Sequence, residues 1–109
     1  MTTPDEIYAE MARHKATITA GLTLKALEAH KGFQELILDG YLNKEALRLV
    51  RSLGRPGISS QEREEAQRRL DAIGVFANYL SCVRDEAEIA RVSLLETEKI
   101  FEEVHAERL

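Results

Sequence analysis

The sequence has few residues that end helices or cross-link a chain. It contains two prolines, Pro4 and Pro56, one cysteine, Cys82, and no tryptophan. A single cysteine permits no disulfide within the chain, which fits a reducing compartment. No run of about 18 apolar residues is present, and the first residues lack the apolar core of a signal peptide. We therefore expect a soluble intracellular protein.

Strand-like alternation is also missing, and helix-forming residues dominate. Apolar residues make up 44% and charged residues 31% of the 109-residue chain, which is a globular balance. We predict one all-α domain over residues 1–109, an antiparallel bundle of three main helices at about 4–30, 33–53 and 59–107.

The prediction depends mainly on the last of these segments. From Ser59 to about Glu107 no proline interrupts it, and one apolar stripe repeats at three- and four-residue steps. A helix of that span is about 70 Å long at 1.5 Å per residue. It cannot bury its stripe against itself, so the rest of the chain or another copy must cover it. The stripe residues that we expect to pack helices or copies together are Leu80, Val83, Ala87, Ala90, Leu94, Phe101 and Val104.

A second apolar face lies beside this stripe after Asp85. The two preceding segments cannot easily cover both faces, so we predict a homo-oligomer that forms through the C-terminal half. The candidate partner face consists of Ile89, Val92, Leu95 and Ile100.

The first two segments carry start and stop signals. Thr3 and Glu6 form a capping box around Pro4, and His30 to Gly32 is typical of a helix end. The first stripe runs through Ile7, Met11, Ile18 and Leu22, with His14 interrupting it and a possible kink at Gly21.

In the second segment the leucine face keeps its phase through Asp39 and Gly40. This favours a continuous helix over a turn there, with a bundle touching it on two sides. Gly54 to Gly57 is the strong loop signal, and Ser59 with Glu62 forms the next capping box.

Charge is unevenly distributed, although the net charge is only −4. Residues 44–69 are net basic and the tail from Asp85 is acidic. Solvated helix faces explain this pattern, and so do complementary ends that meet in an oligomer. Six arginines could present a basic hairpin tip to nucleic acid, although glutamates lie among them. They are Arg48, Arg51, Arg55, Arg63, Arg68 and Arg69.

Sequence motifs for catalysis, metal binding or phosphate binding are weak or absent. Glu102 and His105 have the Glu-x-x-His spacing of di-iron bundles, but no second pair accompanies them. Cys82 has no neighbouring histidine, and no loop has a phosphate-binding glycine pattern. We therefore expect no catalytic residue, no metal and no cofactor, and a protein that is not an enzyme.

One resemblance adds context. The stretch Phe33-Gln34-Glu35-Leu36-Ile37-Leu38-Asp39-Gly40-Tyr41-Leu42, with Glu45-Ala46 and Arg48-Leu49-Val50, resembles small uncharacterised α-helical proteins of tailed bacteriophages. Ala72-Ile73-Gly74, Phe76 and Tyr79-Leu80 add to the likeness. It implies a phage structural or assembly component, located in the cytoplasm of the bacterial host or in the virion, and brings no functional residue with it.

The main hypothesis is therefore a non-enzymatic interaction or assembly protein that self-associates through its long C-terminal helix. A nucleic-acid-associated regulator that uses the arginines is the first alternative. An inhibitor that presents its acidic tail to a host enzyme is the second.

Overall fold

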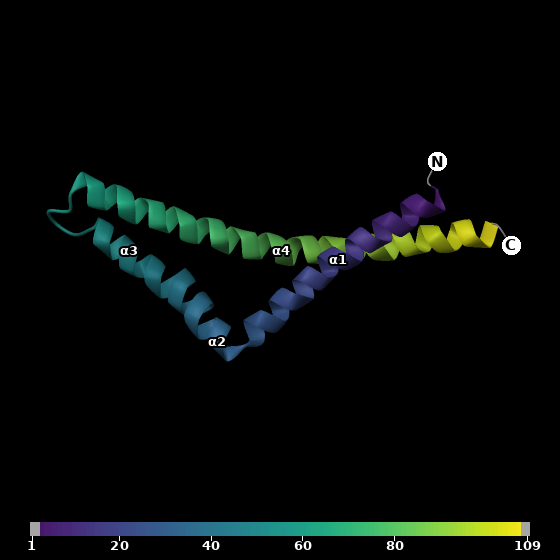
Figure 1. The fold of residues 1–109 in the computed structure, drawn as a ribbon, viewed down its shortest axis with the longest axis horizontal. Helices are drawn as coiled ribbons and strands as arrows, with labels where there is room; N and C mark the ends of the chain where they lie inside the picture. Colours follow the sequence, from purple (N-terminus) through teal and green to yellow (C-terminus); the bar gives the residue numbers. More distant parts are fainter. Residues whose placement is uncertain (1–2, 108–109) are drawn as a thin grey trace. The chain divides into compact units, whose positions relative to one another are not determined.

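A computed structural model describes residues 3–107 of the chain. Its helices follow in the order α1 (Pro4–Ala29), α2 (Lys31–Phe33), η1 (Gln34–Glu45), α3 (Ala46–Leu53) and α4 (Ser60–Glu107) (Figure 1). No strand occurs among the described residues, so the all-α prediction is confirmed. Nor does any helix within this range have both the length and the apolar character needed to cross a membrane.

Both predicted capping boxes form. At the start of α1, the Thr3 amide donates to Glu6 Oε2 (3.0 Å) and the Glu6 amide donates to Thr3 Oγ1 (3.2 Å). Before α4, the Glu62 amide donates to Ser59 Oγ (3.1 Å), and the Ser59 hydroxyl donates to Glu62 Oε1 (3.1 Å). These side chains satisfy amides that a helix start leaves without a backbone acceptor, and so they fix where each helix begins.

The predicted stop after α1 is also present, with a different role for its histidine. The backbone of His30 is extended (φ −80°, ψ 126°), and its Nδ1 accepts a hydrogen bond from the Gly32 amide (3.1 Å). The Gln34 side chain donates to the Glu28 carbonyl at the end of α1 (2.7 Å). His30 therefore caps the start of α2, whereas the sequence pattern placed it at the basic end of α1.

The second segment is continuous from Lys31 to Leu53, as expected, but its middle is not an α-helix. η1 is a π-helix of 12 residues. Gly40 lies inside it, and a β-carbon added there would meet the Glu35 carbonyl oxygen at 2.9 Å. The wider π turn brings this carbonyl close, which explains why a residue without a side chain occupies the position. The Asp39-Gly40 pair is thus neither a turn nor an ordinary α-helical position.

Packing divides the chain into two compact units, which are described separately. Unit 1 contains α1 as far as Leu24 and α4 from Cys82 onward; unit 2 contains residues 25–81. α4 contributes to both units and is one helix from Ser60 to Glu107, without a break at Gly74 or Ser81.

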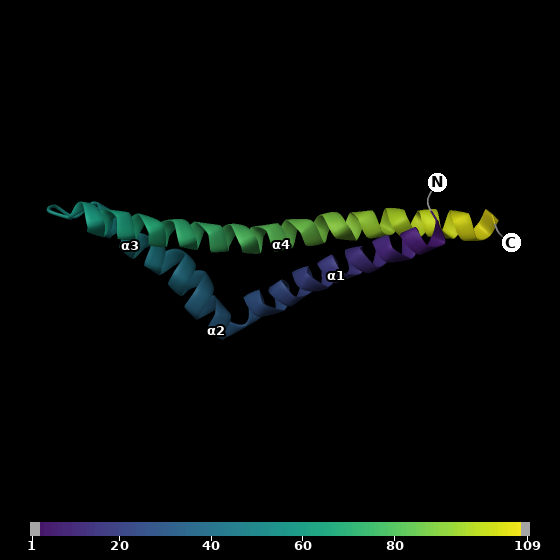
Figure 2. The same cartoon turned by 45° about the horizontal axis from the view of Figure 1, so that its top comes forward.

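In unit 2, α3 lies beside the first part of α4 and runs in the opposite direction (Figure 2). Leu49, Ala66 and Ile73 form its buried cluster, and Leu42, Ala46, Leu53 and Leu70 pack against them. The rings of Tyr41 and Phe76 meet edge to face, with centroids 6.0 Å apart. The segment is nevertheless not enclosed on two sides, because Leu36, Leu47 and Val50 are exposed.

In unit 1, α1 lies beside the last part of α4, again in the opposite direction (Figures 1 and 2). Ile7 and Leu24 are buried, and the Tyr8 and Phe101 rings are 5.2 Å apart. One detail of the predicted α1 stripe, the inward position of Leu22, was wrong. Leu22 is 61% exposed, and His14 is part of the inner stripe, where its Nε2 is buried.

Candidate interaction surface

The apolar stripe of α4 is covered by the chain itself. Among the seven residues predicted to pack helices or copies together, Leu80 lies in unit 2 and the other six lie in unit 1. Leu80 and Ala90 are buried, and Val83, Ala87, Leu94, Phe101 and Val104 are half-buried. Of the two alternatives, the rest of the chain and another copy, the rest of the chain covers this side of α4, because α1 in unit 1 and α3 in unit 2 pack along it.

The second face remains uncovered. Its four predicted residues are Ile89, Val92, Leu95 and Ile100, which are 65%, 46%, 58% and 46% exposed. We call these four the outer face of α4. All of them belong to unit 1. Four large apolar side chains on a short length of one helix are more than the scattered exposed residues of an ordinary surface.

The inner side of unit 1 combines large apolar side chains with small and polar ones. Gly21 allows α1 to approach so closely that an added β-carbon would overlap the Ala87 side chain. Thr97 is buried, and its hydroxyl donates to the Ser93 carbonyl (2.9 Å). His14 and Ala90 also lie on the inner side, with the buried Ile7 and Leu24 and the half-buried Leu94. Large apolar side chains therefore lie on both sides of α4 in unit 1, whereas a surface helix usually has them on one side.

The charges around the outer face are mostly negative. From Asp85 to Glu107, α4 carries eight acidic residues and only two basic ones, Arg91 and Lys99. Arg91 is bound by Glu88, with its Nη2 2.6 Å from Glu88 Oε1. Glu96 and Glu103 follow Ile89 at heptad intervals and so lie on the same row of the helix. Neither has an ion pair within residues 3–107.

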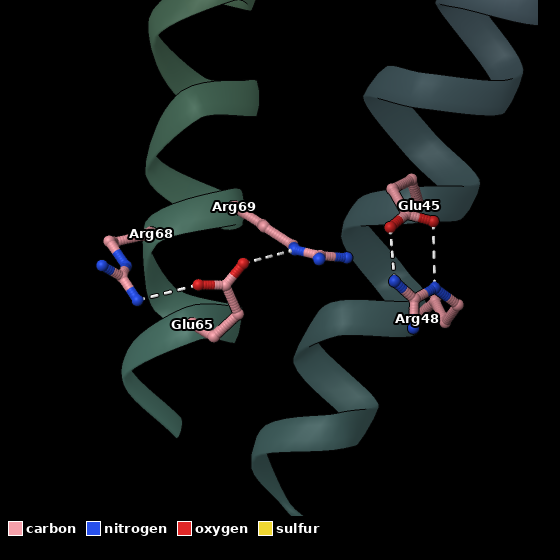
Figure 3. A network of polar contacts seen from close by, with 5 residues as sticks. All are labelled: Glu45, Arg48, Glu65, Arg68 and Arg69. Atoms are coloured by element: carbon pink, nitrogen blue, oxygen red, sulfur yellow. Dashed lines mark hydrogen bonds and ion pairs between the residues drawn. The ribbon is translucent and has the colours of Figure 1, made fainter. Parts of the chain in front are cut away.

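The six predicted nucleic-acid arginines lie in unit 2, and four of them are paired with glutamates. Arg48 binds Glu45 through two hydrogen bonds, and Arg55 Nη2 is 3.2 Å from Glu62 Oε2. Glu65 accepts from both Arg68 (2.8 Å) and Arg69 (3.0 Å) (Figure 3). An open cavity of about 680 Å³ lies beside them, and its lining includes Glu62 and Glu65 as well as four arginines.

These pairs leave little free positive charge at the hairpin. Hydrogen bonding from Arg69 and the nearby charge of Arg68 hold the pKa of Glu65 below its ordinary value. Hydrogen bonding from Arg48 does the same to the pKa of Glu45. The side chains of Arg51 and Arg63 have no ion pair among the described residues. The arrangement thus matches solvated helix faces with internal ion pairs better than a phosphate-binding surface.

The residues considered for chemistry lie apart. His105 is exposed and stacks on Phe101, with ring centroids 6.1 Å apart. Cys82 is exposed on α4. Within residues 3–107, no three histidine, cysteine or acidic side chains are grouped so that they could hold a metal ion.

Two cations that the sequence prediction did not single out belong to unit 1. Arg13 and Lys15 are exposed on α1, and neither side chain has an ion pair in the described part of the chain. Between Met11 and Leu24, α1 contains no acidic residue. The absence of nearby acids was the signal that could have marked these cations as unpaired.

Comparison with known proteins adds no further assignment: no family model, no curated protein and no solved structure matches this chain.

Proposed function

We propose that this protein is a non-enzymatic helical interaction protein that self-associates through the outer face of α4. The observation that carries the proposal is the exposure of Ile89, Val92, Leu95 and Ile100 beside an inner stripe that the chain already covers. The surface for assembly is therefore the second apolar face, and the stripe from Val83 to Val104 serves packing within the chain.

The magnitude of this exposure supports weak association. Complete burial of a large aliphatic side chain is worth about 1.5–3 kcal/mol. Four half-exposed side chains therefore supply roughly 4 kcal/mol, and the surface that receives them must supply the rest of the association energy. We accordingly expect assembly that depends strongly on protein concentration.

The proposal also covers the arrangement of helices between copies and the biological context of the protein. Copies joined through α4 would complete an antiparallel helical bundle that one chain forms only in part. A role as an accessory or assembly component of a tailed phage is supported only by the sequence resemblance over Phe33–Val50 and Ala72–Leu80.

Nucleic-acid binding is the weaker candidate. Arg48, Arg55, Arg68 and Arg69 already bind glutamates, and the outer face of α4 has no row of cations for a phosphate backbone. A salt-titrated mobility-shift experiment would separate this candidate, which requires binding that weakens steeply with ionic strength.

The test is sedimentation velocity over a range of concentrations, with matched variants. Wild-type protein should sediment as an oligomer at tens of micromolar, and the double variant Ile89→Glu/Val92→Glu as a monomer. Val75→Glu is the control, because Val75 is 70% exposed on α4 but lies in unit 2. A wild-type protein that is monomeric at every concentration, or a control variant that dissociates equally, would contradict the proposal.

A further inference from the structure

A second surface in unit 1 has properties that complement the outer face of α4. It is the side of α1 that points away from α4 and contains Ala12, Arg13, Lys15, Ala16 and Leu22, all exposed. We call it the outer side of α1. Leu22 is 61% exposed and adds apolar surface, while the two alanines leave room for larger side chains of an approaching helix.

The charges of the two surfaces are opposite. The outer side of α1 carries Arg13 and Lys15, with no acidic residue between Met11 and Leu24. The row of Ile89 on α4 continues into Glu96 and Glu103, which have no ion pair among residues 3–107. Pairing the outer faces of two α4 helices would instead bring acidic residues of both copies together. Complementary potentials steer and specify an interface, so they favour the mixed pairing.

We infer that the outer face of α4 docks on the outer side of α1 in a second copy of this chain. This inference rests on the proposed function and adds to it the surface that is recognised. Ile89 and Val92 would lie over Ala12 and Ala16, and Glu96, about one turn beyond Val92 on α4, would pair with Arg13 or Lys15.

The inference also determines the symmetry of the assembly. Within unit 1 the two surfaces lie on opposite sides of the helix pair, so each copy offers one surface and fills the other. Such head-to-tail contacts form a closed ring or continue as a filament, whereas pairing of two identical faces stops at a dimer.

The first experiment reverses the charges. Arg13→Glu/Lys15→Glu should weaken association at least about tenfold, as measured by sedimentation velocity. Adding Glu96→Lys to the same chain should restore part of it. Arg51→Glu/Arg63→Glu is the matched control, since those two arginines are also unpaired in the described residues but belong to unit 2. This control should associate like the wild type.

The second experiment mixes two defective variants. Ile89→Glu/Val92→Glu keeps the outer side of α1, and Arg13→Glu/Lys15→Glu keeps the outer face of α4. Each should be largely monomeric alone, and their mixture should form heterodimers that do not grow further. Circular dichroism should show unchanged helix content, because all four substitutions replace exposed residues.

The outcomes separate the two proposals. If the α1 variant still assembles like the wild type, or if the control variant weakens equally, the inference is overturned while self-association through α4 stands. If the wild type itself is monomeric throughout, both fall. Heterodimers in the mixture together with charge rescue would support the inference.

Discussion

In unit 2 the stripe of α4 packs against leucines, and in unit 1 it contains a buried threonine, Thr97, and lies against Gly21 of α1. Leu49, Ala66 and Ile73 are buried together with further leucines around them. In unit 1, Gly21 contacts the Ala87 position, His14 has a buried Nε2 without a hydrogen bond, and Thr97 is buried. The same helix therefore stabilises its two halves by different means.

This difference shows which half is incomplete. Apolar burial is the main favourable term in folding, so unit 2 gains more from its own packing. Unit 1 gains less where Gly21 and Thr97 lie on its inner side, and it leaves four large apolar residues exposed together on the outer face of α4. A unit with this distribution has most to gain from a second copy.

The largest expected effect is that of truncating the core of unit 2. Leu49→Ala removes a side chain that is only 3% exposed and should lower the free energy of unfolding by about 3 kcal/mol, through lost burial and the cavity it leaves. Urea unfolding followed by circular dichroism measures it. Leu94→Ala in unit 1 is the comparison and should cost less, because Leu94 is half-buried. Equal losses in the free energy of unfolding would contradict the proposed difference in packing between the two units.

A smaller loss is expected from filling the close approach in unit 1. Gly21→Ala would place a β-carbon against Ala87, at a cost of about 1–3 kcal/mol, while the better helix propensity of alanine returns about 1 kcal/mol. The net effect should be a destabilisation of about 1 kcal/mol. Combining it with Ala87→Gly should show coupling in a double-mutant cycle. Additive effects would mean that the two positions do not touch.

A glycine-to-alanine substitution in unit 2 should instead raise the free energy of unfolding. Nothing lies within 4 Å of a β-carbon added at Gly74, which is inside α4. Gly74→Ala should therefore stabilise the protein by about 0.5–1 kcal/mol, since it restricts the unfolded backbone without a clash. A higher urea midpoint with an unchanged slope would confirm this, and a lower midpoint would indicate a contact that the described structure lacks.

The smallest expected effect is a loss of stability at acidic pH. The pKa of Glu45 and of Glu65 is lowered in the folded protein by hydrogen bonds from Arg48 and Arg69. The unfolded chain then binds more protons, so this contribution is present above the unfolded pKa and is lost as the pH falls through the lower folded value. The exposed setting keeps it small. Urea midpoints measured across acidic pH should fall more steeply for the wild type than for Glu65→Gln; parallel curves would argue against it.

Much of the fold follows from sequence pattern alone. The stripe from Ile73 to Val104 predicted which side of α4 is buried, because helical periodicity and burial are directly linked. The caps at Thr3 and Ser59 were predictable because they depend on residues three positions apart. The exposed second face was also predictable, since one helix can cover only one side of another.

Other features depend on geometry that residue patterns do not encode. The π-helical turns around Gly40 were missed because the leucine face is apolar in either geometry. Leu22 was misplaced because the close approach at Gly21 decides which side of α1 faces α4. The roles of the arginines were left open because alternating Glu and Arg residues reveal ion pairs only when the helices are in place.

Hydrogen exchange along α4 at low and at high protein concentration tests the central claim most directly. If unit 1 associates through the outer face of α4, amides around Ile89 to Ile100 should become more protected as the concentration rises. Amides of α4 in unit 2, around Ala66 to Ile73, should change much less. Protection that is independent of concentration around Ile89 to Ile100, or that rises equally in both units, would contradict the account.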